Sequence, residues 1–375
     1  MMNTENRPTF RRIKGSTSYL ALEHSNLGLY VYKKRGVLID SGYTEEDALW
    51  IAELLEGEAI RLEAIINTHA HPDNSGGSSY LKKRMGCKIF ATSIQRPFIE
   101  NPSRSNYLAM VQAVVDKEKE ESESQRKRAL LKAENLKKDA APAEGAEATP
   151  EKAEDSPPEG ENPTPAEAEA QDLSAEPVLE FIENDHKRSV IKPKPCQVDG
   201  NLDPKKPFLM SSGKQLQIVD LSGHVMGMCG VVTPDDVFFI ADSLYTFDEL
   251  SDKPIPYLES VEQFKKSLDV LLATPYSNFV PTHGKPLEFS INSEVLFHKR
   301  QIEMIEEAIL LHLQMPHTRE ELVALIFATF GIEQTIPNFY MMSSTIVSFL
   351  NHLKRDRRVA IIHEDGKTRW FTKQK

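Results

Sequence analysis

Cysteine is scarce in this 375-residue sequence. The three cysteines, Cys87, Cys196 and Cys229, are odd in number and far apart. Their spacing excludes the disulfide framework typical of small secreted domains, and it excludes a Cys-x-x-Cys metal clip. A metal site in this chain would therefore have to be built from histidines and carboxylates.

The sequence also lacks a long apolar run. No stretch approaches the roughly 18 consecutive apolar residues that a membrane span needs. Residues 1–14 are polar and contain no apolar segment of the kind found in a secretory signal. We therefore expect a cytoplasmic protein with no membrane partner.

Basic residues are almost missing from residues 141–178. In this stretch eleven acids face the single base Lys152, so its net charge is −10, while the whole chain carries −11. The low pI thus comes from one segment. The nearly neutral remainder neither favours nor excludes an anionic substrate.

The acidic stretch holds seven prolines and nine alanines but almost no large apolar residues. Such a composition cannot offset the entropy that a chain loses on folding, so disorder is predicted. Just before it, at 116–139, acids and bases alternate, which predicts a solvated helix. We interpret residues 113–189 as one tolerated surface insertion; a partner-binding segment is the alternative.

The two flanks of this insertion, 16–112 and 190–296, have the pattern of one α/β domain, and the chain length predicts about two domains in all. Strands alternate with helices and some strands are adjacent, which predicts a layered α/β sandwich. Strands are predicted at 27–32, 36–40, 61–67, 87–91, 215–220, 229–233, 237–240 and 279–281, and helices at 44–55, 78–85 and 260–272.

Four of the eleven histidines share one context. His69 and His71 follow an apolar strand in Thr-His-Ala-His-Pro-Asp-Asn-Ser-Gly-Gly, while His224 follows Leu-Ser-Gly and His283 lies in Pro-Thr-His-Gly. Each stands where a predicted strand ends and a loop begins, as Asp242 does, and rigid scaffolds present chemistry at such positions. We interpret the other seven as ordinary core or surface residues: His24, His186, His298, His312, His317, His352 and His363.

These residue types fit a divalent metal. An ion that keeps one position open for water takes about three protein ligands, and zinc prefers neutral imidazole with carboxylate. His69 and His71 are two residues apart on an extended loop and therefore point to the same side. His224 could complete a three-histidine site. The residues that would then surround a second metal, or orient the nucleophilic water, are Asp73, Asp242 and His283.

Five motifs resemble those of the metallo-β-lactamase superfamily, in the order found in that family. They lie at 36–42, 68–77, 221–224, 240–243 and 280–284, and the resemblance covers roughly residues 16–112 and 190–290. It implies a four-layer αββα sandwich. The likeness is closest to glyoxalase-like and uncharacterised hydrolases of the superfamily, rather than to antibiotic-resistance enzymes.

The resemblance also implies roles for individual residues. Asp40 matches an aspartate that supports the metal ligands without binding the metal. Asn74 stands where the family has a metal-binding histidine, and an amide oxygen is a weaker ligand than imidazole for a zinc-class ion. The positions that match the family's metal ligands are His69, His71, Asp73, His224, Asp242 and His283.

Three outcomes stay open because of Asn74. The site could hold one metal at the three histidines, hold two metals with Asn74 as a poor ligand, or be degraded. With one metal, Asp73 is expected to act as the catalytic base. The implied function is that of a hydrolase with one or two Zn²⁺ ions, or with Fe or Mn instead, whose metal-bound hydroxide attacks an ester, a thioester or a related small electrophile.

Residues 297–375 have a pattern of their own. Helices are predicted at 298–313, 320–330 and 343–356, the second opened by a capping box of Thr318 and Glu321, and a hairpin at 360–371 follows. This order resembles the winged-helix-like C-terminal domain of some lactamase-fold hydrolases.

The end of the chain is basic. From Met341 onward eight Lys and Arg outnumber three acids. The alternative function is therefore a nucleic-acid-binding protein or a nuclease with a weakened metal site. We favour a domain that packs on the hydrolase core, lines its cleft or makes a homodimer contact.

Overall fold

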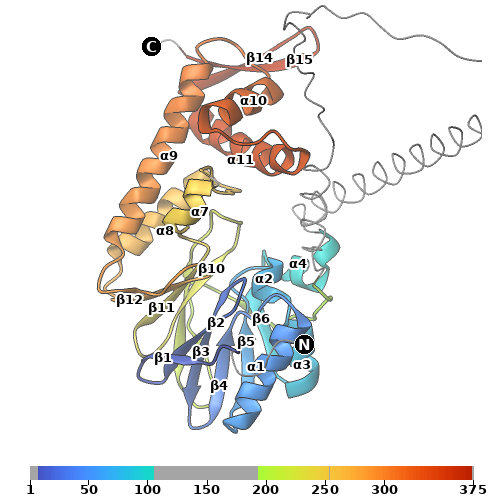
Figure 1. Ribbon diagram of the computed structural model, residues 1–375, viewed down its shortest axis with the longest axis vertical. Coiled ribbons are helices and arrows are strands. Elements are labelled where there is room, and N and C mark those ends of the chain that lie inside the picture. The colour runs from blue at the N-terminus through green and yellow to red at the C-terminus, as the bar shows by residue number, and fades with distance from the viewer. Residues whose placement is uncertain (1–6, 105–192, 253, 374–375) are drawn as a thin grey trace, which may run out of the picture. The chain divides into compact units, whose positions relative to one another are not determined.

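The computed structural model describes residues 7–104, 193–252 and 254–373 (Figure 1). The helix predicted at 116–139 and the acidic stretch at 141–178 lie outside these residues. The description below therefore covers the two flanks of the insertion and the C-terminal part.

The first sheet has seven strands in the described part of the chain. They are β1 (Arg11–Lys14), β2 (Thr17–Ala21), β3 (Asn26–Tyr32), β4 (Arg35–Ile39), β5 (Arg61–Ile66), β6 (Lys88–Thr92) and β7 (Gly200–Leu202). The strands lie in this same order, antiparallel from β1 to β4 and parallel from β4 to β7. Strand β7 follows the insertion yet pairs with β6, so the two flanks form one sheet.

The second sheet has six strands among the described residues. They are β8 (Phe208–Leu209), β9 (Gln215–Asp220), β10 (Cys229–Val232), β11 (Val237–Ala241), β12 (Asn278–Pro281) and β13 (Leu287–Glu288). Their order is β13-β12-β11-β10-β9-β8, and only the β11–β12 pair is parallel. Helix α8 (Val261–Ala273) makes the crossover between these two parallel strands.

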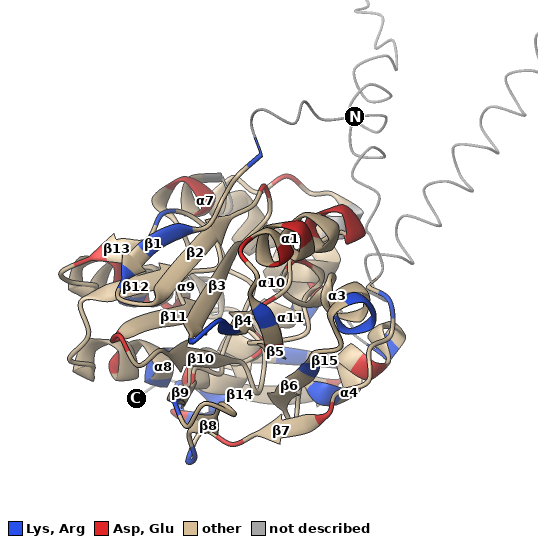
Figure 2. Cartoon of the chain, turned by 90° about the horizontal axis from the view of Figure 1, so that it is seen from below, with Lys and Arg blue, Asp and Glu red and all other residues tan. Residues whose placement is uncertain are grey.

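Several helices that accompany these strands have capping residues or charged side chains at their ends that favour the helix. They are α1 (Glu45–Gly57), α2 (Pro72–Ser75), α3 (Ser78–Met85), α4 (Arg96–Glu100), α7 (Phe247–Asp252) and α8, with a 3₁₀ turn at Pro102–Arg104. Thr44 opens α1 with a capping box, in which it pairs reciprocally with Asp47. Acids fill the first turn of α1 and bases the last turn of α3, so both complement the helix dipole (Figure 2).

Three buried apolar clusters define the layers. Adjacent residues of a strand face opposite sides of its sheet, and the clusters follow that rule. Ile39 and Phe239 belong to the cluster between the sheets, Leu38 packs with α1 on the outer side of the first sheet, and Phe238 packs with α8 on the outer side of the second. The predicted layered α/β sandwich is confirmed as an α/β fold with two mixed sheets.

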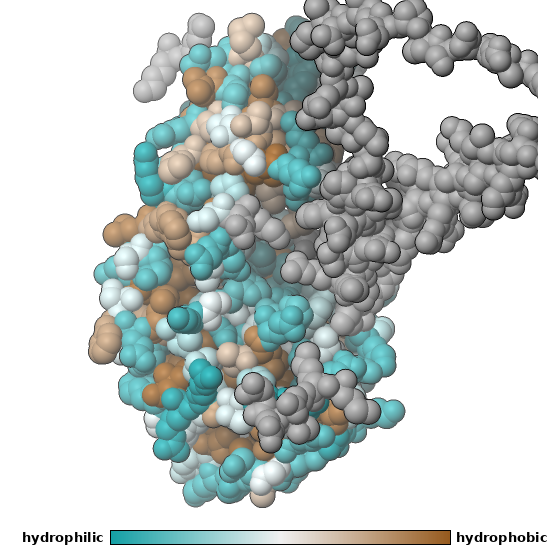
Figure 3. Space-filling view, in the orientation of Figure 1, coloured by the Kyte–Doolittle hydropathy of each residue, from teal (hydrophilic) through white to brown (hydrophobic). Residues whose placement is uncertain are grey.

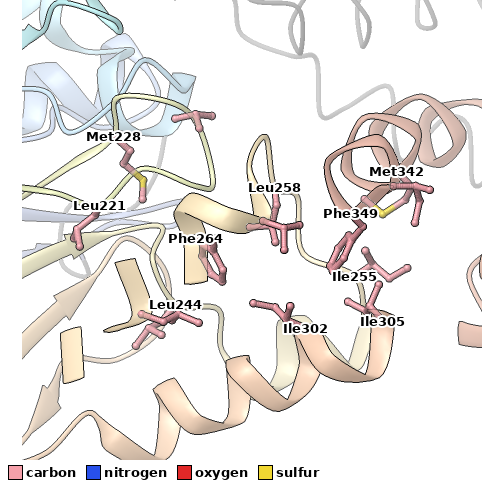
Figure 4. Close-up of a cluster of buried hydrophobic side chains, with 14 of the residues drawn as sticks. Leu221, Met228, Leu244, Ile255, Leu258, Phe264, Ile302, Ile305, Met342 and Phe349 are labelled. Carbon is pink, nitrogen blue, oxygen red and sulfur yellow. The ribbon is translucent and has the colours of Figure 1, made fainter. Parts of the chain in front are cut away.

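The C-terminal part has three helices and a hairpin among the described residues. They are α9 (Asn292–His312), α10 (Arg319–Phe330), α11 (Ile336–Arg355), β14 (Val359–Glu364) and β15 (Lys367–Thr372). Their side chains extend the apolar cluster on the outer side of the second sheet, where Ile302 and Phe349 join Phe264 (Figure 4). Backbone amides of Leu258 and Val261 donate to hydroxyls on α11. These helices are therefore packed onto the α/β core.

Two helix starts differ from the prediction by six or seven residues. Helix α9 begins at Asn292 instead of 298, and α11 begins at Ile336 instead of 343. The Thr335 hydroxyl caps α11 by accepting from the amide of Asn338, with a proline in the first turn. Thr335 and the proline are sequence signals for this start. The apolar period over the first turns is weak, so the pattern predicted a later start. The predicted capping box of Thr318 and Glu321 is confirmed.

The structure agrees with the scarcity of cysteine and of long apolar runs. Cys87, Cys196 and Cys229 are free and buried. Within the described residues, no helix has both the length and the apolar character that a membrane crossing requires. Hydrophilic residues cover much of the face in Figure 3, with hydrophobic ones in smaller areas between them.

Candidate metal centre

The candidate site residues follow the ends of strands from both sheets. His69 and His71 come after β5, His224 after β9, Asp242 directly after β11, and His283 two residues after β12. Strand pairing carries these ends to the same edge of the sandwich. The residues that sequence spacing singled out are thereby brought together.

Four of these side chains form one cluster. His69, His71, His224 and Asp242 each offer a ligand atom within 4.8 Å of the others. His69 Nε2 lies 2.9 Å from Asp242 Oδ2, and His71 Nδ1 lies 3.0 Å from His224 Nε2. Atoms bound to one zinc-sized ion at 2.0–2.1 Å stand about 3.0–3.4 Å apart. The separations of 2.9 Å and 3.0 Å are close to this spacing, whereas His224 Nε2 and Asp242 Oδ2 are 3.8 Å apart.

Two buried atoms of the cluster have unmet bonding capacity. His69 is fully buried, and its Nε2 has no hydrogen-bond partner because its approach to Asp242 lacks hydrogen-bond alignment. Asp242 Oδ1 is buried without a hydrogen-bond partner as well. Leaving such groups unpaired is costly, and a cation in the cluster would satisfy His69 Nε2. The donor set of imidazoles and carboxylate thus fits a divalent metal.

Thr68 and Asp40 orient the ring of His69. The Thr68 hydroxyl donates to Asp40 Oδ2 at 2.9 Å, so it accepts from His69 Nδ1 at 3.1 Å. The proton of the neutral ring therefore sits on Nδ1, and Nε2 presents its lone pair to the cluster.

His224 is oriented in the same way. Its Nδ1 lies 3.1 Å from the carbonyl oxygen of Tyr257, which can only accept, so Nδ1 carries the proton and Nε2 faces the cluster. Burial lowers the pKa of His224 to about 4. The ring is therefore neutral at pH 7, the state in which imidazole binds a metal.

The pKa values of the other cluster residues shift in different directions. Burial lowers the pKa of His71, and the nearby His69 and His224 lower it further. Burial also lowers the pKa of His69, but Asp242 outweighs this and the net pKa is raised. For Asp242 burial raises the pKa, and His69 reverses the effect to leave it well below its usual range. Asp242 is thus a buried carboxylate anion held by its histidine neighbours.

Asp73 and His283 lie on the other side of Asp242. His283 Nε2 is 3.3 Å from Asp242 Oδ1 and 3.4 Å from Asp73 Oδ2. Burial raises the pKa of Asp73, and the negative charge of Asp242 raises it further. Burial lowers the pKa of His283, but Asp242 and Asp73 outweigh it and the net pKa is raised. Asp73 is therefore more basic than an exposed carboxylate, and it stands beside a proton donor.

The backbone is strained on two sides of the site. Asp40 has a φ of 62° and Ala241, just before Asp242, a φ of 49°, both in the left-handed region that L-residues avoid. Burial raises the pKa of Asp40 to about 7, although His69 and the hydrogen bonds from Asn74 and Thr68 oppose it. Asp40 contacts Thr68 and Asn74 in the segment after β5, and its role in supporting the metal ligands stays a prediction.

Asn74 is turned toward Asp40. Its Nδ2 donates to Asp40 Oδ2 at 2.9 Å and to Thr282 Oγ1 at 3.2 Å. Its backbone carbonyl oxygen also accepts from the Ser41 amide at 2.7 Å. The side chain is fully buried, and its Oδ1 has no hydrogen-bond partner. Asn74 thus connects its own segment after β5 to the loop after β4 and to the loop after β12.

Three residues next to the cluster were not predicted from the sequence. Thr68 stands in the first histidine motif, where its position just before His69 was the available signal. Tyr245 and Tyr257 contact His224 from loops 21 and 33 residues farther along the chain. No spacing pattern in the sequence marks either tyrosine.

Comparisons with known proteins agree with this fold. A family model described as the metallo-beta-lactamase superfamily matches residues 21–283. One similar solved structure is a metallo-beta-lactamase family protein from Thermus thermophilus, with 17% identity over 96% of this chain and 99% of that chain and a TM-score of 0.57. Another is a beta-lactamase domain protein from Burkholderia ambifaria, with 14% identity over 99% of this chain and 96% of that chain and a TM-score of 0.62. At these identities the two structures show the shared fold alone.

The comparison with curated proteins found no match. The family assignment therefore stands on the family model, which spans more than half of the chain, together with the fold. This chain belongs to the metallo-β-lactamase superfamily.

Proposed function

We propose that this protein is a hydrolase that holds one divalent metal ion at His69, His71, His224 and Asp242. The single observation that carries the proposal is the buried cluster of ligand atoms within 4.8 Å of one another, in which His69 Nε2 lacks a hydrogen-bond partner. Zinc is the proposed ion because imidazole and carboxylate suit it, with iron or manganese as alternatives.

One metal is proposed because of Asn74. The family's second position would use Asp73, Asp242 and His283 together with the residue at 74. Here the Asn74 amide nitrogen donates to Asp40 and Thr282, and the donor left for a metal is the amide oxygen Oδ1, a weaker ligand than imidazole for a zinc-class ion. A carboxylate and a histidine next to a single ion remain free for proton transfer.

Asp73 is the proposed catalytic base. A bound divalent ion supplies a lowered pKa for water and a positive charge beside the substrate's carbonyl oxygen. The carboxylate of Asp73 lies outside the ligand cluster and is the group proposed to accept the proton of the attacking water. His283 Nε2, 3.4 Å away, then stabilises the carboxyl group in its proper orientation.

An ester or thioester of a small molecule is the proposed substrate class. The charged groups that most strongly shift the pKa values of the described site residues are histidines and acids, with no Lys or Arg among them. A phosphate-bearing reaction centre would need basic side chains there in addition to the metal ion. An acyl group, which is uncharged, does not.

The experiment compares hydrolysis before and after metal removal. The purified full chain is stripped with a chelator, reloaded with Zn²⁺, and assayed on an acyl thioester and an aryl ester. Activity should vanish on stripping, return on reloading, and be absent in His224→Ala. The control is His363→Ala, since His363 is exposed on the C-terminal hairpin. Hydrolysis that survives both stripping and His224→Ala would overturn the proposal.

The nucleic-acid alternative has weaker support. Of the four basic residues between 354 and 358, Arg355 pairs with Glu262, and Arg358 donates to Glu306 at 2.6 Å. Cations already engaged with acids offer less to a phosphate backbone. For the C-terminal part we propose a winged-helix-like domain that packs on the core or makes a homodimer contact. For the whole protein we propose a cytoplasmic location.

A further inference from the structure

Tyr245 lies between the metal cluster and the C-terminal helices. It follows Asp242 by three residues, in the segment between β11 and α7. Its ring centroid is 6.0 Å from that of His224, and its Oη is 2.7 Å from His224 Nδ1. The hydroxyl is therefore within hydrogen-bond distance of the His224 nitrogen that faces away from the cluster.

The hydrogen-bond directions around Tyr245 are determined by one carbonyl group. Tyr245 Oη donates to the carbonyl oxygen of Tyr257 at 3.0 Å, so its lone pairs are available to the proton on His224 Nδ1. The same carbonyl lies 3.1 Å from that Nδ1 and requires the same tautomer. Two acceptors therefore hold the proton of His224 on Nδ1 and leave Nε2 for the cluster.

The backbone of Tyr245 is anchored by helix α9. Its N–H donates to His298 Nε2 at 2.8 Å, and His298 Nδ1 donates to the carbonyl oxygen of Glu294 at 2.7 Å. His298 is 2% exposed, and its ring stacks on that of Tyr245 at a centroid distance of 6.1 Å. His298 thus has one tautomer and one orientation, and it fixes where Tyr245 stands.

We propose that Tyr245 is a positioning residue for metal binding and that His298 on α9 sets its position, so that the C-terminal part of the chain tunes the metal affinity of His224. The inference rests on the proposed function. A hydrogen bond to the second nitrogen of a ligating histidine fixes ring orientation and raises ligand basicity, and its loss typically costs 10–100-fold in metal affinity or activity. An effect near the low end, about 10-fold, is expected here because the Tyr257 carbonyl remains.

The test measures metal affinity in Tyr245→Phe, which removes only the hydroxyl. Zn²⁺ dissociation constants are determined on the full chain by competition with a chromogenic chelator. The matched control is Tyr276→Phe, whose hydroxyl donates to Gln217 at 3.2 Å on an exposed part of the second sheet. We expect about a 10-fold weaker affinity for Tyr245→Phe and no change for the control.

A second readout separates positioning from general structural damage. Cobalt(II) in place of zinc gives visible absorption bands that depend on ligand geometry. The bands should shift in Tyr245→Phe, while the melting temperature of the metal-free protein stays the same. His298→Leu should weaken zinc binding, and His298→Gln, which keeps an acceptor near the Nε2 position, should restore most of it.

The possible results distinguish a failure of this inference from a failure of the proposed function. Wild-type zinc affinity and cobalt bands in Tyr245→Phe would overturn the inference while leaving the proposed hydrolase intact. Weakened affinity in a protein that hydrolyses no ester or thioester would support the positioning role and overturn the function. A wild type that binds no metal would overturn both.

Discussion

Asp73 illustrates how much depends on single side chains in this site. It lies two residues after His71, which belongs to the buried ligand cluster, yet its Oδ2 is near His283 and not part of that cluster. Its pKa is raised by burial and by the charge of Asp242. In the proposed reaction, the residues that would hold the metal are therefore distinct from Asp73, which would accept the proton.

Asp73→Asn should lower kcat by about 10²–10⁴-fold, because general base catalysis contributes that much and an amide cannot accept the proton. Metal content should stay at the wild-type level. Ester hydrolysis and elemental analysis of the same preparations check both points. Asp269→Asn, on the exposed side of α8, serves as the control. Loss of metal in Asp73→Asn would instead make Asp73 a ligand.

Residue identities in the site could be predicted, but their orientations could not. His69, His71, His224 and Asp242 were recognisable because each follows an apolar strand. The hydrogen bonds that turn these rings come from the side chain of Thr68 and from loops that fold back from far along the chain. Such contacts depend on strand pairing, which local sequence patterns do not encode.

At the scale of elements, the loops after β4 and β5 are joined by direct backbone contact. The Gly77 N–H donates to the carbonyl oxygen of Gly42 at 3.2 Å. A Cβ at Gly77 would come within 2.2 Å of the Ser41 carbonyl oxygen, and one at Gly76 within 2.1 Å of that of Tyr43. The two glycines therefore allow α2 and α3 to approach the loop that carries Asp40.

Gly77→Ala should destabilise the fold by about 1–3 kcal/mol, as overpacking does, and should weaken metal binding because the loop bearing His69 and His71 must shift. Thermal unfolding with and without Zn²⁺ measures both effects. Gly57→Ala is the matched control, since a Cβ at this helical position meets nothing within 4 Å and alanine favours the helix. Equal melting temperatures for the two variants would contradict the close approach.

Two predicted elements agree with the structure at both ends. The helix at 78–85 and the strand at 215–220 have the observed bounds. Strands β1, β2, β7, β8 and β13 were missed because most of them are short or carry polar residues on exposed faces. Their strand conformation comes from sheet pairing, which overrides weak local preference.

At the scale of the whole molecule, the C-terminal helices and the α/β core share one apolar cluster and one ion network around the buried Glu306. Glu306 on α9 contacts Lys265 of α8 at 3.1 Å and His352 of α11 at 3.3 Å, and it accepts from Arg358. Burial raises the pKa of Glu306, but the hydrogen bonds from His352 and Lys265 outweigh it and lower the pKa to about 2. The network therefore stabilises the packing of the C-terminal part on the α/β core at neutral pH.

Glu306→Gln should lower the free energy of unfolding at pH 7 by about 2–3 kcal/mol, below the usual cost of breaking a buried pair because Lys265 and Arg358 are partly exposed. The folded-state pKa is depressed, so this stabilisation is present above the unfolded-state value of about 4.5 and is lost as the pH falls toward 2. Denaturant unfolding from pH 7 to pH 2 checks the trend.

The difference between wild type and Glu306→Gln should shrink below pH 4.5. Glu307→Gln, on the exposed side of the same helix, should show no comparable loss at pH 7. A pH-independent difference between wild type and Glu306→Gln would contradict an ionised Glu306.

Metal stoichiometry tests the central claim, one divalent ion per chain, most directly. Wild type, Asn74→His and His224→Ala are saturated with Zn²⁺, freed of excess ion and analysed for bound metal. We predict about one equivalent in the wild type, a value approaching two in Asn74→His, where imidazole replaces an amide held by Asp40, and a value near zero in His224→Ala. Two equivalents in the wild type, or none, would contradict the claim.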